Sequence, residues 1–317
     1  MLLLFILNLT SACGLAQTPQ TKIIREQPLR RAQQEELSDS NMQGSITSQG
    51  RLRTYILHTP KGYGSNRALP LVLVFHGGYG RGRVVQRQSG FNKLADQKGF
   101  FVAYPDGIDK HWNDGRLETT HPDVDDVEFV SALIDHLVKT KNIDPSRIYA
   151  TGISNGGAFT NKLACDLSDK IAAFAPVASS LSKVLASSCK PSKPVSIMMF
   201  NSPEDPFVPW QGGMGRGQGG VKLSVPQTVE WWRNHNDCPP QAENEILPVI
   251  ETKDDTRVKM SRYSGCRNGS EVILYTIEGG GHTWPGRQPR LRLLGRSTRN
   301  ISANDMMWEF FQKHPMK

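Results

Sequence analysis

The stretch Gly152-Ile153-Ser154-Asn155-Gly156 decides the fold of this chain. An apolar run precedes it at residues 147–151, and a helix-like segment follows from Gly157. This order is a strand, a sharp turn and a helix, with a serine at the apex of the turn. The backbone at such an apex is strained and crowded, so glycine is needed two residues before and two residues after the serine. The stretch therefore predicts a nucleophile elbow that presents Ser154.

A second apolar run, residues 71–75, ends in His76-Gly77-Gly78. A continuous apolar run is typical of a buried parallel strand, and the loop after such a strand lies at the edge of the sheet where ligands bind. We expect a backbone N–H of Gly77 or Gly78, together with that of Asn155, to stabilise the negative oxygen of a tetrahedral intermediate. The alternative is an ordinary glycine turn after a strand.

Two further apolar runs lead to an acid and to a histidine. Residues 195–200 run into a loop that carries Asp205, with the adjacent Glu204 as its rival. Residues 271–277 are followed by three glycines and His282. The order nucleophile, acid, histidine is that of the α/β-hydrolase fold. We therefore predict an α/β protein with a mostly parallel central sheet and helices on both faces, in which Ser154, Asp205 and His282 form a catalytic triad that needs no metal and no organic cofactor.

Several longer motifs resemble those of the secreted polyhydroxybutyrate-depolymerase-like and feruloyl-esterase-like enzymes, a group of α/β-hydrolase serine esterases. The resemblance covers the chain from about Gly50 to its C-terminus and implies the same triad. It also implies substrates that are feruloyl or acetyl esters of plant-wall polysaccharides, or polymers of short hydroxyacids. The motifs that carry it are His76-Gly77-Gly78, Tyr104-Pro105-Asp106-Gly107, Trp112-Asn113-Asp114-Gly115, Val124-Asp125-Asp126-Val127, Asp205-Pro206-Phe207-Val208-Pro209 and Gly280-Gly281-His282-Thr283-Trp284-Pro285-Gly286.

Three tryptophans stand in loops that we expect near the triad: Trp112, Trp210 and Trp284. A flat aromatic face stacks on aryl groups and on sugars, so these residues are candidate substrate contacts. The alternative is that they pack the loops around the site. Trp112, in a loop flanked by glycine and polar residues, is the preferred contact.

The N-terminal region differs in composition from the rest of the chain. Met1–Ala12 is apolar but too short to span a bilayer, so we expect a signal peptide over residues 1–16. Small residues before Cys13 favour, as an alternative, a lipoprotein signal that ends before this cysteine and leaves it lipidated. Residues 17–46 are polar and predict a flexible tether, followed by a catalytic domain over residues 47–317. The expected location is outside the cell or in the periplasm or cell envelope.

Four cysteines fall within the predicted catalytic domain. In an oxidising compartment an even number predicts two disulfides, most simply Cys165–Cys189 and Cys238–Cys266. Free buried thiols are the alternative. A zinc site is not expected, because no pair of cysteines has the C-x-x-C spacing.

The formal net charge is +8, and arginines crowd the segment Arg287–Arg299 after the histidine. Such a field could attract acidic polysaccharides or an anionic envelope surface, although a solvated basic face is the plainer interpretation. Nucleic acid is not an expected partner, because no recognition motif accompanies the charge.

Three functions remain open at this point. The preferred one is an exported serine esterase that acts on carbohydrate-linked or polymeric esters. A serine peptidase with the same triad, and a non-catalytic envelope lipoprotein that keeps the fold as a binding module, are the alternatives.

Overall fold

The computed structural model describes residues 40–64, 67–116, 121–215, 220–289 and 291–317. Ser40–Lys317 form one compact unit. The predicted signal peptide, Cys13 and residues 17–39 of the expected tether lie outside the described residues. Among the helices that are described, none is long and apolar enough to cross a lipid bilayer.

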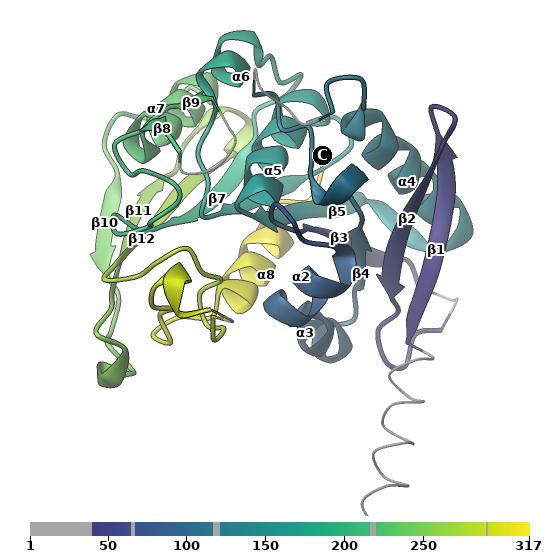
Figure 1. Cartoon of the computed structure of the whole chain (residues 1–317), viewed down its shortest axis with the longest axis horizontal. Helices are drawn as coiled ribbons and strands as arrows, with labels where there is room; N and C mark the ends of the chain where they lie inside the picture. The colour runs from purple at the N-terminus through teal and green to yellow at the C-terminus, as the bar shows by residue number, and fades with distance from the viewer. Residues whose placement is uncertain (1–39, 65–66, 117–120, 216–219, 290) are drawn as a thin grey trace, which may run out of the picture. The chain divides into compact units, whose positions relative to one another are not determined.

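A large twisted sheet runs through the middle of this unit (Figure 1). Within the described residues it has ten strands, in the spatial order β1-β2-β4-β3-β5-β6-β7-β12-β11-β10. A separate two-stranded ribbon, β8 (Gly213–Met214) and β9 (Val221–Lys222), lies outside it. In chain order the strands of the large sheet are β1 (Asn41–Ser48), β2 (Arg51–His58), β3 (Leu69–Phe75), β4 (Phe101–Pro105), β5 (Ile143–Ile153), β6 (Ala173–Val177), β7 (Ser196–Asn201), β10 (Glu243–Ile246), β11 (Arg257–Tyr263) and β12 (Val272–Glu278).

The centre of the sheet is parallel and its two edges are antiparallel. Strands β4, β3, β5, β6, β7 and β12 pair in parallel, while β1, β2, β11 and β10 join in antiparallel pairs. The carboxyl ends of the parallel strands therefore meet at one edge, where the loops that carry the predicted triad begin. The predicted α/β-hydrolase fold is confirmed.

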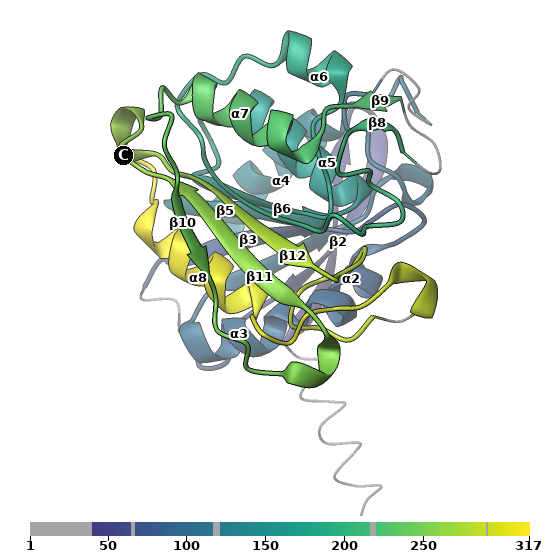
Figure 2. The same ribbon diagram turned by 90° about the vertical axis from the view of Figure 1, so that its left-hand side faces the viewer.

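Helices cover both faces of the sheet, as Figure 2 shows from a second direction. Side chains alternate between the faces along each strand, so Leu73 and Phe75 enter one apolar cluster while Val72 and Val74 enter the other. The first cluster takes in α4, α5, α6 and α7, and the second takes in α2, α3 and α8. The helices are α2 (Gly82–Ser89), α3 (Phe91–Lys98), α4 (Asp126–Thr140), α5 (Asn155–Asp166), α6 (Lys183–Ser188), α7 (Val225–His235) and α8 (Ala303–Lys313), with 3-10 turns at Ile108–Lys110, Thr252–Asp254, Arg267–Gly269 and Arg292–Leu294.

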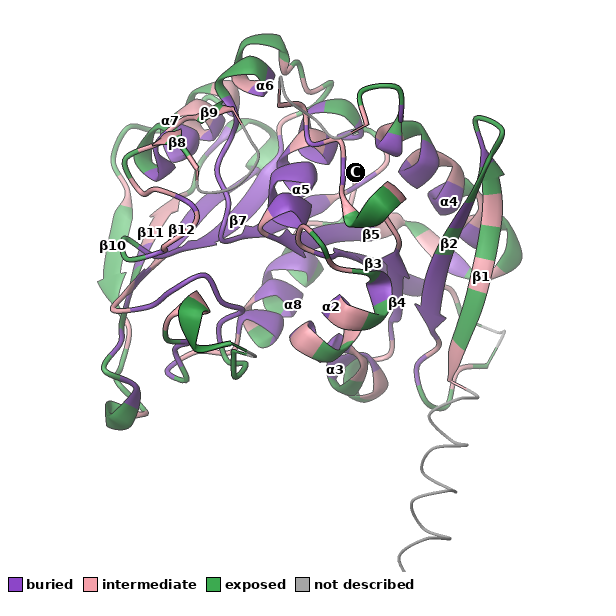
Figure 3. Ribbon diagram, in the orientation of Figure 1, coloured by how far each residue is buried: buried purple, intermediate pink, exposed green. Residues whose placement is uncertain are grey.

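The first strand corrects the predicted boundary of the tether. Residues 41–46 fall within the tether that the sequence predicts over residues 17–46, but they belong to β1 and pair with β2 in antiparallel register. Most side chains of β1 are exposed or half-buried, in contrast to the buried central strands (Figure 3). An edge strand like this is held mainly by backbone hydrogen bonds, so its polar sequence resembles that of a tether.

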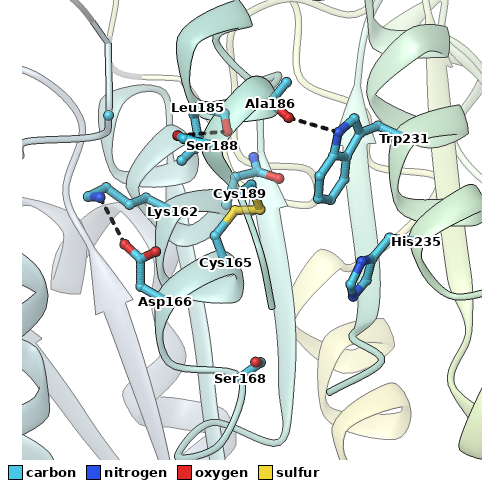
Figure 4. Close-up of a disulfide and its surroundings, with 12 residues drawn as sticks. Lys162, Cys165, Asp166, Ser168, Leu185, Ala186, Ser188, Cys189, Trp231 and His235 are labelled. Atoms are coloured by element: carbon cyan, nitrogen blue, oxygen red, sulfur yellow. Dashed lines mark hydrogen bonds and ion pairs between the residues drawn. A yellow bond between two sulfur atoms is a disulfide. The ribbon is translucent and has the colours of Figure 1, made fainter. Parts of the chain in front are cut away.

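Two disulfides join Cys165 to Cys189 and Cys238 to Cys266, which are the pairs named from the sequence. The first bond connects the last turn of α5 to the residue that ends α6 (Figure 4). Close by, the indole N–H of Trp231 in α7 donates to the carbonyl oxygen of Ala186 at 3.1 Å. The helix that follows Ser154, α5, is thus covalently joined to α6, and α6 is hydrogen-bonded to α7.

Candidate active site

Ser154 stands between β5 and α5 with φ 59° and ψ −121°, a strained backbone for a residue with a side chain. Its N–H donates to the carbonyl oxygen of Val177 at 3.0 Å. The flanking glycines are required by space. A Cβ at Gly156 would lie 2.4 Å from the carbonyl oxygen of Phe75, and one at Gly152 would lie 2.5 Å from the oxygen of Gly156. The turn therefore has the geometry that the sequence predicts for a nucleophile elbow.

Asp205 and His282 contact each other directly. Nδ1 of His282 lies 2.8 Å from Oδ2 of Asp205, and both side chains are buried. The other carboxylate oxygen of Asp205 accepts the N–H groups of Phe207 and Val208 at 2.8 and 2.9 Å. Asp205 follows β7 and His282 follows β12, which are neighbouring parallel strands, so their loops leave the same edge of the sheet.

Glu204, the rival acid, has a different position. Its Oε2 accepts a hydrogen bond from the N–H of Gly279 at 3.0 Å and one from the hydroxyl of Ser202 at 3.1 Å, and the residue is exposed. Glu204 therefore holds the start of the glycine loop that leads to the histidine, whereas Asp205 contacts the imidazole itself.

Ser154 and His282 both line two adjoining pockets, of about 330 Å³ and about 260 Å³. The hydrogen bond to Asp205 uses Nδ1 of the imidazole, so Nε2 is the nitrogen that remains for a proton from the serine. Because Ser154 lines both pockets, the two parts of a substrate that is cleaved at this serine can each occupy one pocket. A hydroxyl, an imidazole and a carboxylate in this order can carry out acyl transfer through a covalent acyl-serine.

The candidate oxyanion donors lie against the serine. A Cβ at Gly77 would be 3.3 Å from Cβ of Ser154, so the glycine allows this loop to approach the elbow. Gly78 and Asn155 line the first pocket together with Ser154. The N–H of Asn155 lies in the first turn of α5, where helical N–H groups have no partner within the helix. These positions keep Gly77, Gly78 and Asn155 as candidate donors.

The side chain of His76 holds the loop that carries Gly77 and Gly78 in place, a role that is not evident from the sequence. Its Nε2 accepts the N–H of Gly107 at 3.0 Å, so the proton of the neutral ring is on Nδ1, which donates to the carbonyl oxygen of Gly77 at 2.8 Å. Burial lowers the pKa of His76 to about 4, which keeps the ring neutral at pH 7. The two bonds fix the orientation of the Gly77 carbonyl beside the predicted oxyanion site.

The side chain of Asn155 is fixed by the segment after β4. Its Oδ1 accepts the N–H of Trp112 at 2.8 Å, and its Nδ2 donates to the oxygen of Trp112 at 3.1 Å and to Asp114 at 2.9 Å. Asp114 in turn forms an ion pair with Arg116. The Trp112-Asn113-Asp114-Gly115 motif therefore anchors the first turn of α5.

The structure corrects the role expected for Trp112. This side chain is 2% exposed, stacks on Phe159 at 4.9 Å between ring centroids and donates to the carbonyl oxygen of His76. It is a core residue, because the aromatic ring is needed to fill the space between β3 and α5. Trp284 is 1% exposed and borders the second pocket, while its indole N–H donates to Asn304. Trp210 packs against the core and is not among the described residues that line either pocket.

The first pocket has lining residues that sequence reasoning missed. Tyr79 and His111 pack edge to face with ring centroids 4.5 Å apart, and Phe207 lies 5.1 Å from the ring of His282. Arg116 and Lys222 bring positive charge to the lining of the same pocket. Arg116 directly follows the Trp112-Asn113-Asp114-Gly115 motif, but no sequence signal marks Lys222, which comes from the short ribbon β8–β9.

The arginine-rich segment lies on the other side of the site. Arg287 borders the second pocket and also an open groove of about 650 Å³ that Arg292, Arg296 and Arg299 line. Arg296 pairs with Asp255 at 3.6 Å and Arg299 with Glu251 at 3.3 Å, so part of this charge is balanced locally. A metal site is not formed by the described residues, since no cluster of three His, Cys, Asp or Glu side chains occurs among them.

The fold is that of the α/β-hydrolase class, and the pocket holds a serine and a histidine, with an aspartate bonded to the histidine. Comparison with known proteins gives the family. Residues 53–208 match the family model described as esterase PHB depolymerase. A putative esterase, NocK of Nocardia uniformis subsp. tsuyamanensis, is 30% identical over 275 residues, which cover 82% of this chain and 79% of that protein. The chain belongs to the esterase PHB depolymerase family and is a carboxylic ester hydrolase.

Other relatives have more specific names. Feruloyl esterase B of Piromyces equi is 32% identical over 239 residues, which cover 73% of this chain but only 42% of that larger protein. Among solved structures, the acetyl xylan esterase from Aspergillus awamori superposes with a TM-score of 0.58 at 14% identity, covering 86% of this chain and 99% of the other. At this identity the superposition shows a shared fold.

Proposed function

We propose that this protein is an exported serine esterase in which Ser154, His282 and Asp205 hydrolyse carboxylic esters through an acyl-enzyme. The observation that carries the proposal is the hydrogen bond between His282 and Asp205 in a pocket that Ser154 also lines. The substrate class is polysaccharide-linked feruloyl or acetyl esters, or polyhydroxyalkanoate-type esters. The names of the relatives support this class, and so do two pockets that meet at the serine.

The reaction follows from the geometry in two halves. Oγ of Ser154 attacks the ester carbon while Nε2 of His282 takes the hydroxyl proton, and the imidazolium that forms is stabilised by Asp205. N–H groups of Asn155 and of Gly77 or Gly78 stabilise the oxyanion, and losing one such donor lowers kcat by about 10²–10³-fold. The C–O bond then breaks, and the alcohol leaves with the proton from His282. Water, deprotonated by the same imidazole, releases the acid and restores the serine.

The test compares the wild-type protein with Ser154→Ala on a short-chain aryl ester such as 4-nitrophenyl acetate. Turnover by the wild type that is lost in the variant supports the esterase. A folded wild-type protein that hydrolyses no acyl ester would instead favour the binding-module alternative, and cleavage of peptides but not of esters would favour the peptidase. Methyl ferulate, acetylated xylan and a hydroxybutyrate oligomer, assayed side by side, then identify the acyl group.

Export rests on two supports. The two disulfides fit an oxidising compartment, where such bonds persist. The apolar N-terminal stretch before Cys13 fits a signal sequence, with lipidation of Cys13 as the alternative to complete removal. Mass spectrometry of the N-terminus of the mature protein distinguishes cleavage after residue 16 from a diacylated Cys13.

A further inference from the structure

The charges on the wall of the first pocket are all of one sign. Its described lining residues include Arg116 and Lys222, together with Ser154 and His282, and none of the lining residues is an aspartate or a glutamate. Lys222 reaches this wall from β9, and its Cε would lie 3.4 Å from a Cβ placed on Gly215. The pocket thus pairs the predicted nucleophile with a cationic side.

The acids nearest to this wall are already engaged. Asp114 pairs with Arg116 and accepts a hydrogen bond from Asn155. Asp205 accepts two backbone N–H groups and the imidazole of His282. In the described part of the chain no carboxylate lies within ion-pairing distance of Lys222. Burial lowers the pKa of its ammonium group, an effect that the more distant charge of Asp114 partly offsets.

Lys222 is half-buried at the pocket and has no direct counter-charge, so a ligand that supplies the missing negative partner would gain from binding there. From this imbalance beside Ser154 we infer that the natural substrate carries a carboxylate that binds Lys222 in the first pocket. A singly charged group fits best, because Arg116 is balanced by Asp114 and one cation remains. A phosphate group would bring up to two negative charges.

The inference rests on the proposed esterase function and narrows its substrates to esters that carry a negatively charged carboxylate. The carboxylate belongs to one of two parts of the ester. In the alcohol part it would be a sugar acid or a related hydroxyacid, and in the acyl part it would be the second carboxylate of a diacid. Both place the same chemistry against Lys222, and the experiment separates them.

Two matched pairs of esters test the inference. In the first pair, 4-acetoxybenzoate and 4-acetoxybenzamide, the charge is in the alcohol part. In the second, the monomethyl esters of adipic acid and of adipamic acid, it is in the acyl part. Proton release in a pH-stat at pH 7 gives kcat/KM for each ester. We expect the wild type to favour the anionic member of one pair by about 10- to 100-fold, as a charge-assisted hydrogen bond provides.

Variants at position 222 show whether Lys222 causes the preference for the anionic ester. We expect Lys222→Met to abolish the preference, because kcat/KM of the anionic ester falls by about 10- to 100-fold more than that of the neutral ester, and we expect Lys222→Arg to retain most of the preference. Lys98→Met removes an exposed lysine of α3 and serves as the matched control, with no expected change. If Lys222→Met fails to fold, competitive inhibition of the wild type by benzoate and by benzamide gives the same comparison, with benzoate expected to bind more tightly.

The outcomes separate the inference from the function it rests on. Equal kcat/KM for charged and neutral esters in the wild type, or an equal loss for both in Lys222→Met, would overturn the carboxylate site while the esterase stands. Hydrolysis of none of the four esters, or hydrolysis unaffected by Ser154→Ala, would overturn the proposed function and the inference with it.

Discussion

Nδ1 of His282 and Oδ2 of Asp205 lie 2.8 Å apart, although the two residues are 77 positions apart in sequence. Strands β7 and β12 bring them together, because these strands are parallel neighbours and end at the same edge of the sheet. The adjacent Glu204 binds the N–H of Gly279 instead. Two adjacent acids therefore have different contacts: Asp205 contacts the imidazole of His282, and Glu204 holds the start of the glycine loop.

This difference predicts the effect of two amide substitutions. Asp205→Asn should lower kcat by about 10³–10⁴-fold, because the amide no longer stabilises the imidazolium or fixes its tautomer. Glu204→Gln should retain activity within about tenfold, since it keeps an acceptor for Gly279. Steady-state kinetics on 4-nitrophenyl acetate measure both. The reverse pattern would assign the acid to Glu204.

Activity should depend on pH through His282. An imidazolium cannot accept the serine proton, so kcat/KM should fall by about tenfold per pH unit once the ring is protonated in the free enzyme. A pH–rate profile from pH 4 to pH 9 on a neutral ester checks this, with circular dichroism at each pH to exclude unfolding. A rate that stays constant down to pH 4 would contradict a histidine base.

The stability of the protein should depend on pH through His76. Burial lowers the pKa of this ring to about 4, whereas an unfolded histidine titrates near 6.5. The unfolded state therefore binds more protons between these values, so the contribution of His76 is complete above about pH 6.5 and is lost as the pH falls towards 4, amounting to about 3 kcal/mol.

The measurement for His76 is urea unfolding of the wild type and of His76→Gln at pH 7 and at pH 4. Glutamine does not bind a proton in this pH range, so only the wild type loses stability through position 76 as the pH falls. The free energy of unfolding of the wild type minus that of the variant should therefore be about 3 kcal/mol smaller at pH 4 than at pH 7. Other groups titrate equally in both proteins and cancel. A difference that is the same at both pH values would show that this ring is not held neutral.

Trp112 should matter for stability and not for contact with substrate. Trp112→Ala removes a buried ring that stacks on Phe159, which typically costs about 3–5 kcal/mol of unfolding free energy. Trp210→Ala, at a half-buried position, should cost less. Thermal unfolding compares the two variants. If Trp112→Ala unfolds like the wild type but raises KM, the residue contacts substrate after all.

The disulfide Cys165–Cys189 should stabilise the helix that follows Ser154. It spans 24 residues of sequence. Replacing both cysteines by alanine should lower the free energy of unfolding by about 3 kcal/mol through the added entropy of the unfolded chain. Urea unfolding of the double variant measures the loss, and a reducing agent should then shift the midpoint of the wild type more than that of the variant.

The sequence alone was enough to predict the fold and the order of the candidate triad. Local rules made this possible: the elbow needs glycines around Ser154, buried parallel strands are continuous apolar runs, and loops with an acid or a histidine follow those strands. The polar edge strand β1 escaped the same rules, because backbone pairing and not an apolar face holds it in place.

Tertiary structure decided what each side chain touches. The choice between Asp205 and Glu204, the burial of Trp112, the support of Gly77 by His76 and the approach of Lys222 to the pocket all depend on contacts between residues distant in sequence. A glycine turn or an apolar run follows from the physics of neighbouring residues, whereas burial and charge pairing depend on the packing of the whole sheet and its loops.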